Sequence, residues 1–186
     1  QVIDTMPAKL LPLYQRIIHY QRLLAHKRVA NPGHFRSNNY RAARAKLQRD
    51  YQKVTRIQAD LLHKFTAGLV RANDVIAIEN LDNQRMRMNK RLAKHLHRSL
   101  FGQFKQIVAY KCAWSGTKLV LVDQFYPSTQ RCSQCGYVKT GDDKIGLSGN
   151  RKHHTGHDVY VCYQCGAMLR RDENAVENLI QYALAN

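Results

Sequence analysis

Apolar residues recur at helical spacing in two long stretches near the start of the chain. Between residues 7 and 28 they fall three and four positions apart, and the same period returns between residues 39 and 72. Because about 3.6 residues make one helical turn, this spacing places the apolar side chains on one face of each helix. Pro32 and Gly33 lie between the stretches and favour a turn. The pattern predicts an antiparallel helical hairpin over about residues 7–72.

Two shorter stretches have the pattern of strands. Val75 to Ile78 is an unbroken apolar run, which is typical of a strand buried on both faces, and residues 117–123 predict a second strand. Glu79 directly follows the first run, so its carboxylate would stand at the C-terminal end of a strand, where open α/β sheets carry their sites. A carboxylate there would be costly if it were simply part of the core, so Glu79 is a candidate site residue.

The charge of the chain narrows the class of partner. Its 186 residues include 30 Lys plus Arg against 13 Asp plus Glu, a formal net charge of +17. This excess favours a polyanion, most simply nucleic acid, with an anionic membrane surface as the weaker alternative. No run of 18 apolar residues is present, so we expect no membrane-spanning helix. The start of the chain shows no signal-peptide pattern, which favours the cytoplasm, and it lacks an initiator Met, as expected of a fragment or processed product.

Positive charge is concentrated in two segments. Residues 1–73 carry 14 Lys plus Arg and three Asp, so we interpret the hairpin as a cationic arm along phosphates, with an ordinary solvated face as the alternative. Residues 83–111 predict a further helix with one apolar side and carry eight Lys plus Arg and no acidic residue. The candidate nucleic-acid contacts there are Arg85, Arg87, Lys90, Arg91, Lys94 and Arg98.

Four cysteines form two pairs with two residues inside each pair and 26 residues between the pairs. The four are Cys132, Cys135, Cys162 and Cys165. Four thiolates at this spacing close a tetrahedral structural zinc site, and the Gly after each pair suits the tight turn. Two disulfides are the alternative, but they require an oxidising compartment. A ligand role for His153, His154 or His157 is not needed, and Cys112 is expected to be a buried free thiol.

A second candidate carboxylate, Asp172, opens a predicted helix directly after the cysteine-rich segment. An ordinary helix cap is the alternative reading of this residue. If the strand that ends in Glu79 and this helix are neighbours in one α/β layer, the two carboxylates can converge. Carboxylate oxygens bind Mg²⁺ or Mn²⁺, and two such ions about 4 Å apart can clamp the oxygens of a phosphodiester that is being cleaved.

Three motifs together resemble a known family. They are Tyr126-Pro-Ser-Thr-Gln-Arg-Cys-Ser-Gln-Cys-Gly136, Val161-Cys-Tyr-Gln-Cys-Gly166 and Arg171-Asp-Glu-Asn-Ala-Val-Glu-Asn-Leu179. In this order they resemble the C-terminal signature of TnpB (OrfB), the RNA-guided nucleases of IS200/IS605-type transposons and relatives of Cas12. Asp74-Val-Ile-Ala-Ile-Glu-Asn-Leu81 resembles the strand of this family that bears a catalytic Glu.

The resemblance implies an α/β fold, namely an RNase H-like (RuvC) nuclease domain with a long helical-hairpin insert and a four-cysteine zinc-finger insert. It implies a RuvC-like domain over 1–124 with the hairpin at about 7–72, a zinc-finger insert that binds target nucleic acid over 125–167, and a C-terminal RuvC helix over 168–186. Glu79 and Asp172 match the second and third catalytic carboxylates, which hold two Mg²⁺ or Mn²⁺ ions. The zinc is structural, and the partners are guide RNA and target DNA in a prokaryotic cytoplasm, with no membrane.

The first catalytic carboxylate of the family has no match in this chain. The family carries it in a pattern like Gly-Ile-Asp-x-Gly on an early strand, and we expect that strand and the guide-binding domains upstream of residue 1, in the missing N-terminal portion of the same protein. Asp4 is a possible substitute. A cleavage-inactive fragment or descendant that only binds nucleic acid is the alternative to the nuclease.

Overall fold

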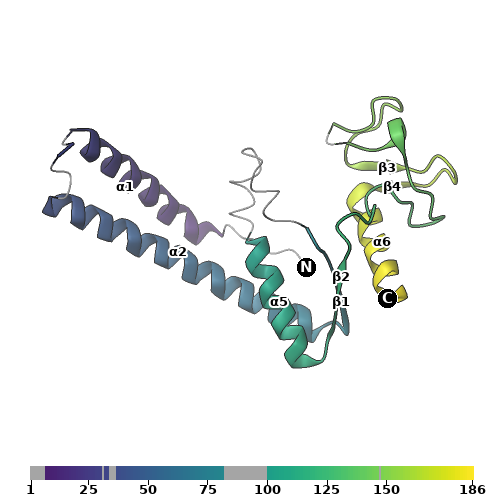
Figure 1. Ribbon diagram of the computed structural model, residues 1–186, viewed down its shortest axis with the longest axis horizontal. Helices are drawn as coiled ribbons and strands as arrows, with labels where there is room; N and C mark the ends of the chain where they lie inside the picture. Colours follow the sequence, from purple (N-terminus) through teal and green to yellow (C-terminus); the bar gives the residue numbers. More distant parts are fainter. Residues whose placement is uncertain (1–6, 31, 34–36, 82–99, 147) are drawn as a thin grey trace. The chain divides into compact units, whose positions relative to one another are not determined.

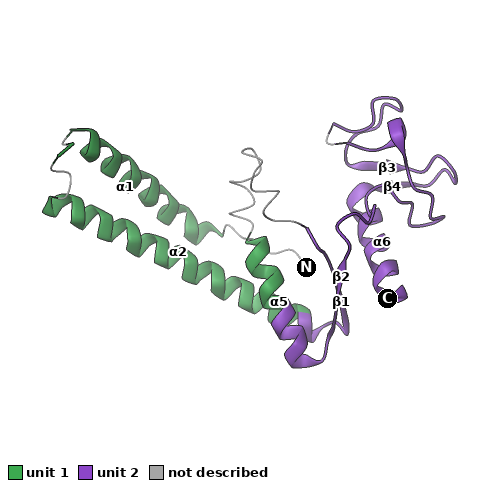
Figure 2. Cartoon of the chain, in the orientation of Figure 1, with its two compact units in different colours: residues 1–69, 90–108 green, residues 70–89, 109–186 purple. Residues whose placement is uncertain are grey.

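A computed structural model describes residues 7–30, 32–33, 37–81, 100–146 and 148–186 (Figure 1). The chain divides into two compact units, one of residues 1–69 and 90–108 and the other of residues 70–89 and 109–186 (Figure 2). Both helices and strands are present, as predicted. Nowhere in the described part of the chain is a helix both long and apolar enough to cross a membrane.

The first unit contains the predicted helical hairpin. A 3-10 turn, Ala8–Leu10, leads into helix α1, Leu11–Ala30, and helix α2 follows as Asn38–Arg71. The observed helices agree with the predicted ones to within a few residues. Their apolar faces meet in two clusters, one around Leu10, Leu13, Ile17 and Val54, and the other around Leu24, Tyr40 and Ala43. Burial of these side chains stabilises the pairing, because each fully buried Leu or Ile contributes roughly 1.5–3 kcal/mol.

Helix α5, Phe101–Ser115, is the part of the predicted helix over 83–111 that the structure describes, and it continues four residues beyond the expected end. The proposed nucleic-acid contacts in this region lie outside the described residues. They are Arg85, Arg87, Lys90, Arg91, Lys94 and Arg98. Cys112 on α5 is buried and free, which confirms its expected role, and burial raises the pKa of its thiol.

The second unit is built on a parallel strand pair. Strand β1, Val75–Glu79, pairs with β2, Lys118–Val122, so that Glu79 lies opposite Val122. Both predicted strands are confirmed, and Glu79 is the last residue of β1. The prediction that β1 is buried on both faces is only partly right. Ile76 and Ile78 are buried, but Ala77 is half-buried and Val75 is exposed.

Helix α6, Arg171–Ala185, packs on one face of this strand pair. Ala183 and Leu179 of the helix contact a cluster formed by Val120 and Val122, and Ala77 packs against the same cluster. Side chains alternate between the two faces of a strand, so the face that carries Ala77 also carries Glu79. The carboxylate of Glu79 therefore belongs to the face that α6 covers.

The cysteine-rich segment lies between β2 and α6. It contains a 3-10 turn, Gly141–Asp143, and two short antiparallel strands, β3, Val159–Val161, and β4, Met168–Arg170. Its core consists of the two buried cysteines, Cys132 and Cys162, together with Ile145 and Tyr160. Gly136 and Gly166 adopt φ of 77° and 75°, the left-handed conformation that glycine accepts without strain, so the turn expected after each cysteine pair is present.

Candidate metal centres

Four sulfur atoms converge from the two cysteine pairs. The Sγ atoms of Cys132, Cys135, Cys162 and Cys165 all lie within 4.8 Å of one another. Cys135 and Cys162 are 3.5 Å apart at sulfur, and Cys132 and Cys165 are 3.8 Å apart. Four ligands at the usual Zn–S distance of about 2.3 Å in a tetrahedron are about 3.8 Å from one another. Two of the sulfur–sulfur distances thus lie close to the value for a tetrathiolate metal site, and all four cysteines are free rather than paired in disulfides.

Two thiols of the cluster, those of Cys162 and Cys135, have pKa values shifted in opposite directions. Burial disfavours the thiolate of Cys162, but backbone N–H groups of Cys165 and Gln164 donate to it, and with the neighbouring thiols they lower its pKa to about 7. Cys135 accepts a hydrogen bond from the backbone of Tyr137, which favours its thiolate, yet desolvation and the other three sulfurs raise its pKa to about 12. A divalent ion held by these cysteines would favour their thiolates, since coordinated thiols lose their protons.

A buried lysine stands close to the sulfur cluster. Lys139 is 1% exposed, and its Nζ has no hydrogen-bond partner within the described residues. The ammonium lies 3.6 Å from the ring centroid of Tyr163 and 4.8 Å from that of Tyr160, so two aromatic faces hold it. Burial lowers its pKa, whereas Asp143 and the cysteines oppose that shift. Zinc with four thiolates carries a net negative charge, so Lys139 fits as a nearby counter-charge.

The group of mutually close ligand atoms consists of the four cysteines, and the three histidines of this segment make other contacts or lie in turns. Nε2 of His153 lies 3.0 Å from Oδ1 of Asp143, and the imidazole stacks on Tyr163 at 3.9 Å between centroids. His154 adopts a φ of 52° in a turn, and the backbone oxygen of His157 accepts a hydrogen bond from Arg171.

The second candidate centre begins at Glu79. The hydroxyl of Ser128 donates a hydrogen bond of 2.7 Å to Oε1 of Glu79. Ser128 is buried, so this bond fixes one carboxylate oxygen of a half-buried glutamate and leaves the other oxygen available. Ser128 lies inside the Tyr126-Pro-Ser-Thr motif, so the sequence could have indicated it as a candidate site residue. Nothing in the sequence pairs it with Glu79, which lies 49 positions away.

Two buried asparagines of α6 hold the loop that carries Ser128. Asn178 donates through Nδ2 to the backbone oxygens of Ser128 at 2.9 Å and of Arg131 at 2.7 Å. Asn174 accepts from the backbone N–H of Ser133 at 2.9 Å and donates to the oxygen of Arg131 at 2.7 Å. A continuous set of hydrogen bonds therefore joins Glu79, the loop before the first cysteine pair, and α6.

Asp172 lies in the first turn of α6. Arg170 occupies the N-cap position and makes no side-chain capping bond, so Asp172 is not the N-cap residue, although its charge suits the helix dipole. Leu179, seven residues later, packs on the strand pair, and two helical turns place Asp172 on that same stripe of the helix. Its side chain is 94% exposed, and its Oδ1 lies 3.8 Å from Nε of Arg171.

The direction of α6 places its N-terminal half next to the C-terminal end of the strands. Asn174 and Asn178 bind the loop that follows β2, and Ser128 of that loop binds the last residue of β1. Glu79 thus stands on the face that α6 covers, and Asp172, whose side chain is exposed, lies in the first turn of the same helix. Both residues belong to the same unit of the chain.

Two family models match the chain. Residues 17–90 match the model described as "Probable transposase" (OrfB_IS605), and residues 101–179 match "Cas12f1-like, TNB domain". A "Putative RNA-guided DNA endonuclease" from Streptomyces pristinaespiralis is 33% identical over 149 residues, which are 80% of this chain and 34% of the relative. The Cas12f1 endodeoxyribonuclease from Sulfoacidibacillus thermotolerans is 26% identical over 127 residues, 68% of this chain and 25% of the relative.

The fold has a counterpart among solved structures. In a cryo-EM structure of a Cas12f1–sgRNA–target DNA complex, one chain matches with a TM-score of 0.51 at 15% sequence identity over 87% of this chain and 41% of the matched chain. The chain spans about a third of the length of the curated relatives it matches. The chain belongs to the TnpB (OrfB) family, to which Cas12f1 is related.

Proposed function

We propose that this chain forms the nuclease part of an RNA-guided DNA endonuclease, and that Glu79 and Asp172 hold the divalent ions that its RuvC-like, RNase H-type site uses. The observation that carries this proposal is the hydrogen bond between Ser128 and Glu79. It fixes a carboxylate at the end of a strand, on the face covered by the helix that bears Asp172. The relatives named as RNA-guided DNA endonucleases support the reaction class.

The donor set suits Mg²⁺ or Mn²⁺. Carboxylate oxygens are the ligands that these hard cations prefer, and Asp172 is open to solvent, which such ions need because they keep part of their water shell. When bound, a pair of such ions lowers the pKa of an attacking water and stabilises the leaving oxygen of the phosphodiester. In this proposal Glu79 acts as a ligand whose orientation Ser128 fixes, and Asp172 acts as the second ligand. Neither residue is a proton donor.

The nucleic acids are guide RNA and target DNA. A net charge of +17 favours phosphate contacts throughout the chain, while sequence is read by base pairing between guide and target. The resemblance to TnpB further implies that a first carboxylate and the guide-binding domains belong to the same protein, N-terminal to residue 1. The cysteine-rich segment would bind one structural zinc and hold the target nucleic acid beside the site.

The test is cleavage by the protein of the complete gene, purified with its RNA. Glu79→Gln and Asp172→Asn keep the size of each side chain and remove its charge. We expect each to reduce Mg²⁺-dependent cleavage of a matched DNA by at least about 100-fold while DNA binding is retained. Glu177→Gln, at an exposed position of the same helix, is the matched control and should cut normally.

Two outcomes would contradict the proposal. Cutting that survives both substitutions would remove Glu79 and Asp172 from the site. A wild-type protein that binds guide RNA and target DNA with Mg²⁺ present but never cuts would establish the alternative, a cleavage-inactive nucleic-acid-binding protein.

A further inference from the structure

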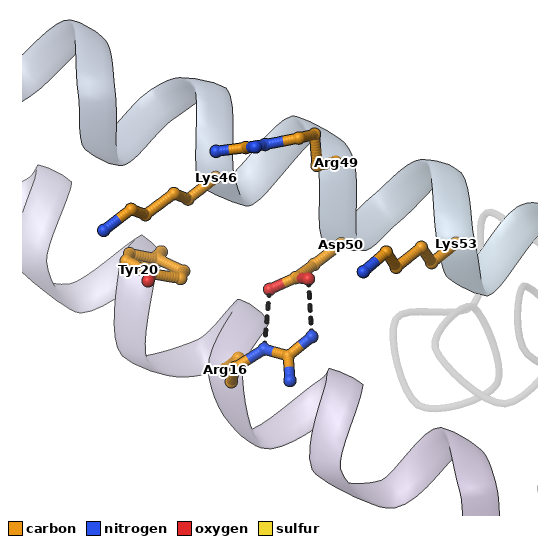
Figure 3. Close-up of a pocket in the computed structure, with 6 residues that line it drawn as sticks. All are labelled: Arg16, Tyr20, Lys46, Arg49, Asp50 and Lys53. Carbon is orange, nitrogen blue, oxygen red and sulfur yellow. Dashed lines mark hydrogen bonds and ion pairs between the residues drawn. The ribbon is translucent and has the colours of Figure 1, made fainter.

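A pocket of about 200 Å³ lies between the two helices of the hairpin, away from both candidate metal centres in the sequence. Figure 3 shows α1 and α2 side by side with the lining side chains between them. The lining residues are Arg16, Tyr20, Lys46, Arg49, Asp50 and Lys53. All six belong to the same unit of the chain.

The pocket has an excess of three positive charges. Four of its side chains are cationic and one, Asp50, is anionic. Asp50 binds only Arg16 directly among the lining residues, accepting bonds of 2.7 Å from Nη2 and 3.0 Å from Nε. The side chain of Asp50 is 8% exposed, and this pairing with Arg16 lowers its pKa, with smaller contributions from Lys53 and Arg49. A single carboxylate that is already paired in two hydrogen bonds leaves the other cations without a counter-ion among the residues that line the pocket.

The arrangement orients one of the four cations and places the other three on one side of a helix. Two nitrogens of Arg16, Nε and Nη2, donate hydrogen bonds to Asp50. These two bonds hold the guanidinium in one orientation. Lys46, Arg49 and Lys53 are spaced three and four residues apart on α2 and so share one side of that helix. Like charges at this spacing on a helix repel one another. An anion bound between these side chains would attract all three of them and so offset their mutual repulsion.

We propose that this pocket binds one phosphodiester group of a nucleic-acid strand. The planar fork of an arginine and the point charges of lysines are the groups that proteins use for phosphate. The choice of a nucleic acid rests on the proposed function and on the hairpin's own charge, since residues 1–73 carry 14 Lys plus Arg against three Asp. Arg16 would give the phosphate its orientation, and Lys46, Arg49 and Lys53 would supply charge.

The experiment compares two double substitutions on α2 in the 186-residue chain. Lys46→Gln with Arg49→Gln removes two charges from the pocket. Arg41→Gln with Arg44→Gln removes two charges from exposed positions of the same helix that do not line the pocket. Binding of a fluorescent RNA of about 20 nucleotides, and of the DNA of the same sequence, is measured over a series of salt concentrations. Far-UV circular dichroism checks that both variants keep their helices.

The pocket double variant should bind at least one of the two strands more weakly at every salt concentration. Loss of one phosphate contact should reduce the slope of log K against log salt by about 1. The control double variant should leave that slope nearly unchanged. Lys53→Gln alone should change binding in the same direction as the pocket double variant.

Three results would overturn the proposal. Equal losses in both double variants would show that only the overall charge of the helix matters. Saturable binding of inorganic phosphate that is lost in the pocket double variant, while that variant binds RNA and DNA like the wild type, would assign the pocket to the free ion. Binding of polyglutamate that is tighter than that of RNA and DNA, and is lost in the pocket variant, would assign it to an acidic peptide. Because the readout is binding, failure here leaves the cleavage test of Glu79 unaffected.

Discussion

The hydroxyl of Ser128 donates a 2.7 Å hydrogen bond to the carboxylate of Glu79 across 49 positions of sequence. Ser128 itself is held through its backbone oxygen by Asn178 of α6. A carboxylate that must ligate a cation gains from such a partner, since the bond restricts its rotation before the cation arrives.

Replacing Ser128 with Ala should therefore weaken the site without removing a ligand. We expect cleavage by the full protein to fall about 10- to 100-fold at low Mg²⁺ and to recover partly as Mg²⁺ is raised, because an outer partner of a ligand acts through affinity. Ser128→Thr, which keeps a hydroxyl, should retain more activity. Ser133→Ala in the same loop is the control, since only its backbone groups bind α6 in the structure. Unchanged Mg²⁺ dependence in Ser128→Ala would exclude the positioning role.

Asn178→Ala should destabilise the second unit. It removes one amide that donates to two backbone oxygens, those of Ser128 and Arg131, and leaves them without this partner. We expect a loss of about 1–3 kcal/mol in the free energy of unfolding, the usual cost of stranding a buried polar group. Urea denaturation followed by circular dichroism measures it. Glu177→Ala, on the exposed side of α6, should change stability by less than about 0.5 kcal/mol, and an equal effect of the two would contradict this account.

Removal of zinc should unfold the cysteine-rich segment. The protein purified without chelator should contain one zinc per chain by elemental analysis, and Cys135→Ser or Cys165→Ser should reduce that content strongly. Because the core of this segment includes two of the cysteines, its amides should lose protection from hydrogen exchange in chelator. Cys112→Ser should keep its zinc, since Cys112 lies apart on α5. Full zinc content after loss of a paired cysteine would rule out the tetrathiolate site.

Lys139→Met should lower the zinc affinity of the same site. The substitution keeps the length of the side chain and removes the positive charge that is held over Tyr160 and Tyr163. We expect a decrease of about 10-fold or more in affinity, as for other outer partners of a metal site, measured by competition with a zinc-binding dye. Lys144→Met, at an exposed position in the same segment, should bind zinc like the wild type. Equal affinity in both variants would exclude a counter-charge role for Lys139.

The hairpin should lose stability in acid through Asp50. The hydrogen bond from Arg16 lowers the pKa of Asp50 below its usual value of 3.8, so the folded state binds this proton less readily than the unfolded state. The stabilisation is therefore complete above the usual pKa and is lost as pH falls through the lower, folded value. Thermal melts of helix content between about pH 2 and 6 should show this decline. Asp50→Asn should flatten it, whereas Asp60→Asn, at an exposed ion pair with Lys64, should not.

The sequence pattern was most informative where the interacting residues lie close together in the chain or at a fixed spacing. The hairpin and both strands follow from apolar periodicity, because burial selects one face of each element. The residues that lie 34 and 49 positions apart, Arg16 with Asp50 and Ser128 with Glu79, could not be paired in this way. Their partners depend on how elements pack, and no local pattern encodes that. Burial of β1 was overestimated for the same reason, since an apolar run does not reveal how much of a strand its neighbours cover.

By itself, the sequence determined which four thiols cluster, the carboxylate at the end of β1, and the family. Fixed spacing and residue chemistry suffice for each of these, because two thiols separated by two residues reach one ion in almost any fold. Only the tertiary structure decided that Glu79 lies on the face covered by α6, that two asparagines of α6 bind the loop beside it, and that four cations surround Asp50. These relationships arise from packing between distant segments, where the cost of leaving buried polar groups unpaired selects one arrangement.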